Sequence, residues 1–123
     1  MPIRPVIALF LCACCAGTAI AAPQRTLPPP PPEPVQVQVV LREWEIAMVD
    51  RFPAGTVRFH VINAGTIHHS FEISGNGVIG STGVLSPGDS VQLTVTLAPG
   101  DYIVDCPVDG HYTMGMKRQV WVR

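Results

Sequence analysis

Strict alternation of apolar and polar side chains is the feature that most constrains the fold of this chain. It is clearest over residues 91–97, where valine and leucine at odd positions alternate with glutamine and threonine at even ones, and residues 35–41 and 57–61 carry nearly the same pattern. A period of two is that of a strand with one buried face. Turn sequences rich in Pro, Gly and Asp separate these segments, at residues 53–55, 86–89 and 99–101. The pattern predicts an all-β chain folded as a Greek-key β-sandwich of seven to eight short strands, with no helix longer than a turn.

The alternation changes phase after the first predicted strand. Apolar side chains occupy odd positions up to Leu41, whereas Trp44, Ile46 and Met48 occupy even ones. An insertion or bend near residues 42–43 would re-aim the strand. We therefore expect the chain to cross there from one sheet of the sandwich to the other, with Trp44 on the buried face.

The first residues are typical of an export signal. Arg4 supplies a short positive start, residues 6–16 are apolar, and residues 19–21 (Ala-Ile-Ala) have the small-x-small pattern at which such signals are cleaved. The apolar run is too short to span a bilayer whose hydrocarbon core is about 30 Å thick. We expect residues 1–21 to be a signal peptide and the mature protein to be exported or periplasmic.

A lipid anchor is the alternative for this end of the chain. The sequence Leu-Cys-Ala-Cys at residues 11–14 resembles a bacterial lipoprotein processing site. Cleavage there would leave a lipidated Cys14 and a protein anchored to the membrane.

Proline dominates the next segment. Residues 22–34 include five consecutive prolines at 28–32, whose fixed φ and missing N–H groups favour an extended, unpacked chain. We expect residues 22–34 to be a linker and residues 35–123 to form the single folded domain.

The charge balance restricts the partners. The formal net charge is −1, and Lys and Arg are not clustered. Nucleic acids and anionic membranes are bound through concentrated positive charge, so neither is expected as a partner.

Cysteine usage singles out one thiol. Cys12, Cys14 and Cys15 fall in the predicted signal peptide, so residues 35–123 contain only Cys106 and cannot form an internal disulfide. A lone thiol in an oxidising compartment is prone to oxidation unless it is buried or bound to a metal. Cys106 is therefore a candidate metal ligand.

Residues 106–116 place three potential metal donors in one short loop. Cys106 offers a thiolate, His111 an imidazole and Met116 a thioether, with four residues on each side of His111. Soft sulfur donors with imidazole favour copper, whereas zinc gains little from methionine. Each residue alone has a structural alternative: a buried thiol, a surface histidine, and methionines that fill the core. As a set, they indicate a mononuclear copper site, in which Met114 competes with Met116.

The same loop resembles the closing loop of the cupredoxin family of blue copper proteins. That loop has a Cys at the end of a strand, then a Gly-His pair and a Gly-Met pair, here Cys106, Gly110-His111 and Gly115-Met116. The resemblance extends over the whole predicted domain, and the spacing is most similar to that of rusticyanins and sulfocyanins. It implies one type 1 copper ion in a monomer that carries single electrons, is not an enzyme, and meets a redox partner protein transiently.

The family also carries a histidine ligand after an Asn-x-Gly turn. Residues 63–65 (Asn-Ala-Gly) match this turn, and the resemblance implies His69 as the ligand. His68 competes for the role, but neighbouring side chains of a strand point to opposite faces, so only one of them can reach the site. Phe71 and Ile73 are expected to face the core, which places His69 on the buried face.

Family spacing favours Met116 over Met114 as the axial ligand. The axial bond is expected to be long and weak, so that it tunes the reduction potential without holding the metal. Pro107, Tyr112 and Met114 would form a small apolar rim around His111, the histidine through which the family passes electrons.

Ser70 departs from most relatives, which carry Asn directly after the first histidine ligand; rusticyanins carry Ser. That position belongs to the shell that orients the ligands. We expect a relatively high reduction potential for this reason, and a lower one in Ser70→Asn. Pro107, which has no N–H near the sulfur, acts in the same direction.

Two other function classes compete with an electron carrier. A periplasmic copper-binding or delivery protein fits the His68-His69 pair and the two methionines of the loop, because exposed donors favour exchange. Copper oxidases and nitrite reductases resemble multi-domain chains with additional histidine sites, which this chain lacks, and a binuclear centre needs a second loop cysteine where Gly110 stands.

Overall fold

The computed structural model describes residues 17–123. The chain divides into two units, and the folded one is Pro31–Arg123. Residues 1–16, which hold most of the predicted signal peptide and the proposed lipidation site at Cys14, lie outside the described residues. In the described part of the chain, no helix is long and apolar enough to cross a membrane.

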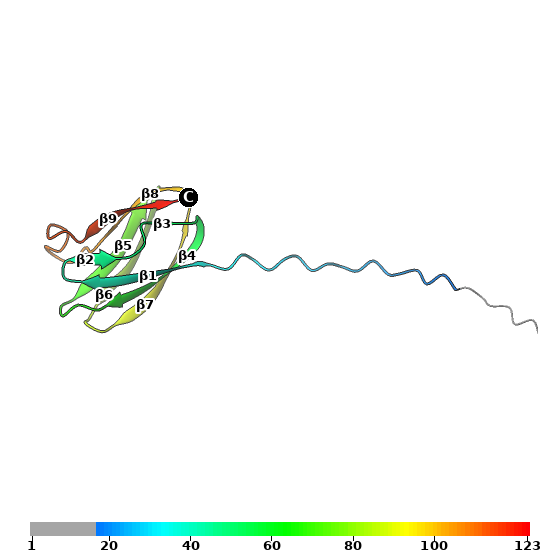
Figure 1. The fold of residues 1–123 in the computed structure, drawn as a ribbon, viewed down its shortest axis with the longest axis horizontal. Helices are drawn as coiled ribbons and strands as arrows, with labels where there is room; N and C mark the ends of the chain where they lie inside the picture. The colour runs from blue at the N-terminus through cyan, green and yellow to red at the C-terminus, as the bar shows by residue number, and fades with distance from the viewer. Residues whose placement is uncertain (1–16) are drawn as a thin grey trace, which may run out of the picture. The chain divides into compact units, whose positions relative to one another are not determined.

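Nine strands make up the folded unit, which is a sandwich of two sheets (Figure 1). One sheet has the strand order β2-β1-β4-β7 and the other β3-β9-β8-β5-β6. The strands are β1 (Val35–Arg42), β2 (Glu45–Ala47), β3 (Arg51–Phe52), β4 (Gly55–Asn63), β5 (His69–Gly75), β6 (Val78–Leu85), β7 (Ser90–Leu97), β8 (Gly100–Asp105) and β9 (Lys117–Val122). The predicted all-β sandwich is confirmed, and the strands beyond the expected seven to eight are the short β2 and β3.

The alternating segments form the centre of the first sheet. β1 pairs with β4 in parallel, with Val37 opposite Phe59, and β4 pairs with β7 antiparallel, with Phe59 opposite Leu93. The odd-numbered side chains of β1 and β4 point into the sandwich, where Val39 and Phe59 are fully buried. Period-two patterning therefore set the face of each strand, because a shift by one residue would expose all of these side chains.

Aromatic and aliphatic side chains from both sheets fill the space between them. Phe59 of β4 contacts Phe52 of β3 edge-on at 5.7 Å between ring centroids, and Phe71 of β5 at 5.3 Å. Tyr102 is buried with its hydroxyl donating to the Ala98 carbonyl at 2.9 Å. Fully burying such a side chain contributes about 1.5–3 kcal/mol. The core is thus a continuous apolar layer that fixes the two sheets against each other.

The crossing between sheets lies later in the chain than the phase shift predicted. Residues 43–44 form a two-residue turn, and β2 folds back on β1 in the same sheet, with Arg42 opposite Glu45. The chain reaches the other sheet only at β3, which pairs in parallel with β9. The phase changed because a hairpin turn, rather than a bend, separates the two apolar series.

Trp44 is also placed differently from the prediction. Ile46 is buried and Met48 packs partly against the core, as expected, but Trp44 sits in the turn and is 40% exposed. A turn residue belongs to neither strand face, so the alternation of its neighbours does not apply to it.

Candidate metal centre

His69 begins β5 and is fully buried, whereas His68 just before it is exposed. Phe71 and Ile73 of the same strand are also fully buried, as the alternation predicted. Among the described residues, no group hydrogen-bonds to Nδ1 of His69, although this nitrogen is buried. An unpartnered buried nitrogen is costly unless it binds something, so the His69 side chain is suited to holding a metal.

The turn before His69 is held by Asn63. Its amide nitrogen donates to the carbonyls of Ile67 and Leu85, both at 2.9 Å, and its side-chain oxygen accepts the N–H of Gly65 at 2.9 Å. Asn63 is fully buried at the end of β4. This explains why an Asn-x-Gly sequence precedes the histidine, because the amide fixes the path of the chain into β5.

Cys106 follows β8 directly and is fully buried. Its sulfur accepts the backbone N–H of Ser70 at 3.3 Å, which joins the loop to β5. The main chain of Ser70, the residue after His69, thus links β5 to the cysteine of the loop. Cys106 is the free cysteine of the described residues.

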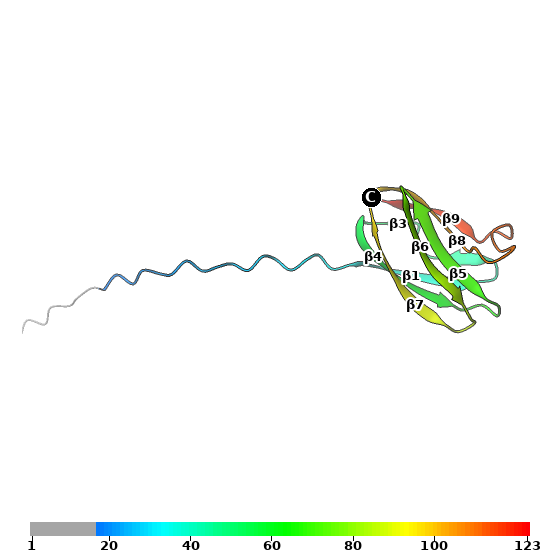
Figure 2. The ribbon, with the colours of Figure 1, turned by 180° about the vertical axis from the view of Figure 1, so that it is seen from behind.

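The loop of residues 106–116 is closed by its own backbone. The N–H of Cys106 donates to the carbonyl of Met116 at 3.0 Å, and the N–H of Met116 donates to the carbonyl of His111 at 3.2 Å. Gly110 and Gly115 have φ of 80° and 107°, a region that side chains rarely adopt. The two backbone hydrogen bonds hold Cys106, His111 and Met116 close together. Figures 1 and 2 show the loop between β8 and β9 at one end of the sandwich.

Three of the four predicted ligands converge on one point. A ligating atom from each of His69, Cys106 and His111 lies within 4.8 Å of the others, and all three residues are buried. Nδ1 of His111 is 3.4 Å from Sγ of Cys106, and the ring centroids of His69 and His111 are 5.0 Å apart. Burial, and then the nearby His69, lower the pKa of His111 below its usual 6.5, which favours the neutral imidazole that binds metals.

The two methionines of the loop have different surroundings. Met116 is fully buried and bonded through its backbone to Cys106 and His111, whereas Met114 is 54% exposed. A buried thioether, a cysteine sulfur and two imidazoles together make a donor set of the kind that copper prefers. The residues present therefore fit a copper ion, with Met116 better placed than Met114 to join them.

Two neighbours of the site were missed by the sequence. Oε1 of Glu43 lies 3.2 Å from Nε2 of His69, and the ring of Trp44 contacts His111 edge-on at 5.1 Å between centroids. The signal available for both was the break in alternation at residues 42–43. The break indicated a change in the path of the chain at these residues, but it did not show that the β1–β2 turn lies beside β5 and the 106–116 loop.

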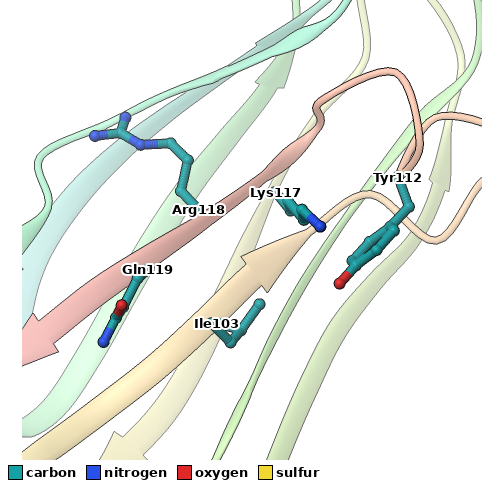
Figure 3. A pocket seen from close by; sticks show the side chains of 5 residues that line it. All are labelled: Ile103, Tyr112, Lys117, Arg118 and Gln119. Atoms are coloured by element: carbon teal, nitrogen blue, oxygen red, sulfur yellow. The ribbon is translucent and has the colours of Figure 1, made fainter.

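A separate open pocket of about 300 Å³ lies beside the loop, on the outer face of β8 and β9. It is lined by Ile103, Tyr112, Lys117, Arg118 and Gln119, and Figure 3 shows the Lys117 side chain directed toward Tyr112. Nζ of Lys117 is 4.3 Å from the centroid of the Tyr112 ring. This pocket contains none of the four predicted ligands.

Solved structures similar to this chain include auracyanins and rusticyanin. Auracyanin from Roseiflexus castenholzii matches with a TM-score of 0.63 and 23% identity, over 72% of this chain and 97% of its own. Reduced rusticyanin matches with a TM-score of 0.60 and 25% identity, over 72% of this chain and 79% of its own. The chain has the cupredoxin fold. Auracyanin A from Chloroflexus aurantiacus, described as a blue copper protein, gives a TM-score of 0.59 at 18% identity, over 74% and 100%.

The resemblance to cupredoxins that the loop suggested is therefore confirmed. Rusticyanin, the branch indicated by the loop spacing, is among the matches, and the auracyanins are matches that the sequence did not single out. No protein-family model and no curated protein sequence matches this chain.

Proposed function

We propose that this protein is an exported carrier of single electrons, with one type 1 copper ion held by His69, Cys106, His111 and Met116. The observation that carries the proposal is the convergence of a thiol and two imidazoles within 4.8 Å in a buried position. The buried Met116 and the unpartnered Nδ1 of His69 support the same assignment. Auracyanin A, a blue copper protein that shares the fold, supports copper over other metals.

Copper bound by these residues would supply one-electron chemistry between Cu(II) and Cu(I). The chain's part is to keep the donors in nearly the same place in both states. His69 begins β5 and Cys106 directly follows the neighbouring strand β8, and the Ser70 N–H bond to the sulfur joins the two segments. Such a framework limits rearrangement when the charge changes, which is the property that an electron carrier needs.

His111 is the proposed route for electrons to a partner. It is 7% exposed, and exposed Trp44, Tyr112 and Met114 lie in or beside its loop. A small apolar surface suits a brief encounter with a redox partner protein, because transient redox interfaces are small. We propose such a transient partner, and a carrier rather than an enzyme.

Export is part of the same proposal. It is supported by the signal-like sequence of residues 1–21. A lipid on Cys14 remains the alternative form of export, and the mass of the mature N-terminal peptide distinguishes the two.

Copper delivery is the second candidate function. The exposure of His68 and Met114 favours it, because exposed donors can pass a metal on, whereas the full burial of His69 and Met116 favours retention. Incubating the Cu(I) form with a chelator separates the two functions. A carrier is expected to cycle rapidly without losing metal, and a delivery protein to release it.

Titration of the protein with Cu(II) tests the proposed site. An intense thiolate-to-copper absorption is expected in the wild type and in His68→Ala, and its loss in Cys106→Ser. A colourless protein that binds Zn(II) as well as Cu(II) would contradict the proposal.

A further inference from the structure

Glu43 reaches from the turn between β1 and β2 to the buried histidine of the other sheet. Oε1 of Glu43 lies 3.2 Å from Nε2 of His69, and the carboxylate side chain is 26% exposed. The same oxygen accepts the backbone N–H groups of Thr66 at 2.7 Å and Ile67 at 3.0 Å. Bonds from two successive N–H groups fix this oxygen in place, so its position beside His69 is built into the loop before β5.

A glutamate side chain is ionised at neutral pH, and here the carboxylate oxygen beside His69 accepts two backbone N–H groups. An ionised carboxylate can only accept hydrogen bonds, so Nε2 of His69 must donate to it. In the neutral ring, Nδ1 then carries the free lone pair, and Nδ1 is the buried nitrogen without a partner.

Gly65 makes the approach of the two groups possible. A Cβ at this position would meet Oε1 of Glu43 at 2.5 Å and Nε2 of His69 at 2.8 Å. Both distances are shorter than real Cβ contacts, so any other residue would displace the carboxylate or the ring. The contact between Glu43 and His69 therefore requires glycine at position 65.

We infer that Glu43 is a positioning residue for the metal site, which fixes the orientation and tautomer of His69 and lowers the reduction potential of the bound metal. This inference rests on the proposed copper site. A carboxylate that accepts from a ligating histidine makes the ring a stronger donor, and its negative charge favours the more positive oxidised metal. The effect on the potential is opposite to the one expected from Ser70.

Glu43→Gln is the variant that tests the inference in the full chain. Glutamine keeps an oxygen acceptor for the loop N–H groups but removes the charge. Glu45→Gln is the matched control, because Glu45 is exposed in β2 and the charge change is the same. Affinity for Cu(II) is expected to fall about 10- to 100-fold in Glu43→Gln, the range typical for such partners. Each tenfold loss that is specific to Cu(II) over Cu(I) raises the potential by about 59 mV.

Gly65→Ala provides a second, independent test. Like Glu43→Gln, it should raise the reduction potential, because the new Cβ pushes the carboxylate away from His69. In the Glu43→Gln background the same change should add little, since the two substitutions act on one contact. Additive shifts would contradict the inference.

The metal-free protein gives a readout that does not depend on copper. Nitrogen NMR of the His69 ring should show the proton on Nε2 in the wild type and in Glu45→Gln, and a mixture of tautomers in Gly65→Ala. A wild type with the proton on Nδ1 would overturn the inference. So would a blue wild type whose potential is unchanged in Glu43→Gln. A wild type that never becomes blue would instead refute the proposed copper function, while the tautomer still tests the Glu43 contact.

Discussion

Two methionines separated by one residue in the 106–116 loop offer a matched pair of substitutions. Met116 is fully buried and Met114 is 54% exposed. We expect Met116→Leu to shift the reduction potential while the thiolate-to-copper absorption persists, because an axial thioether tunes the metal without holding it. The free energy of unfolding should change by less than about 1.5 kcal/mol, as in volume-conserving core substitutions. Voltammetry and urea unfolding provide the measurements.

Met114→Leu is the control for this prediction. Substitution of an exposed side chain is expected to leave both the potential and the absorption unchanged, with a stability effect within about 0.5 kcal/mol. The opposite pattern, a shift in Met114→Leu alone, would assign the axial position to Met114.

At the scale of single residues, the sequence predicted the orientation of a side chain where that side chain follows the alternation of its own strand. Alternation alone placed His69 on the buried face with Phe71 and Ile73, and His68 outside. Glu43 could not be found in this way, because it contacts a residue 26 positions later in the chain. Its role depends on the turn that brings β1 and β2 beside β5, and no local pattern records that contact.

At the scale of strand pairs, two like charges face each other across β5 and β8. Asp105 pairs with Glu72, and burial, followed by this carboxylate, raises the pKa of Asp105 above its usual 3.8. Ionised Asp105 therefore costs stability at neutral pH. We expect Asp105→Asn to raise the free energy of unfolding at pH 7 by about 0.2–1 kcal/mol, the range for cross-strand pairs.

The pH dependence distinguishes this cause from a packing effect. The folded state binds the Asp105 proton more tightly, so stability falls as pH rises through the raised pKa, and both states are protonated well below pH 3.8. The advantage of Asp105→Asn should thus vanish near pH 3. Asp101→Asn, which removes a surface ion pair with Arg123, should give no gain at pH 7.

The strands with clear period-two alternation were predictable from the sequence. β1, β4 and β7 have eight or nine residues each, long enough for alternation to show. β2 and β3 have only three and two residues, which is too short for any period. The parallel pairing of β1 with β4 was also not predictable, because pairing depends on the fold of the whole sandwich.

In the molecule as a whole, the apolar core draws on strands of both sheets, whereas the loop between β8 and β9, which carries three of the four candidate ligands, lies at one end of the sandwich (Figure 1). Phe59, Tyr102 and Val122 are buried without contributing to the site. We therefore expect the metal-free protein to stay folded, with a lower melting temperature than the loaded form. The free energy of unfolding of the loaded form should be higher by about 2.7 kcal/mol when free metal is at 100 times its dissociation constant. A metal-free chain without cooperative unfolding would contradict this.

Acid should then weaken the metal-free protein through His111. Its folded pKa lies below 6.5, so the unfolded chain binds the proton more readily and stability falls as pH drops below that value. The carboxylate of Glu43, with a pKa of about 2 against 4.5, acts in the same direction only at lower pH. Urea unfolding at pH 7 and pH 5 therefore isolates the histidine. We expect a lower free energy of unfolding at pH 5, a smaller difference between the two pH values in His111→Gln, and an unchanged difference in His68→Gln, because His68 is exposed and its substitution leaves the buried His111 in place.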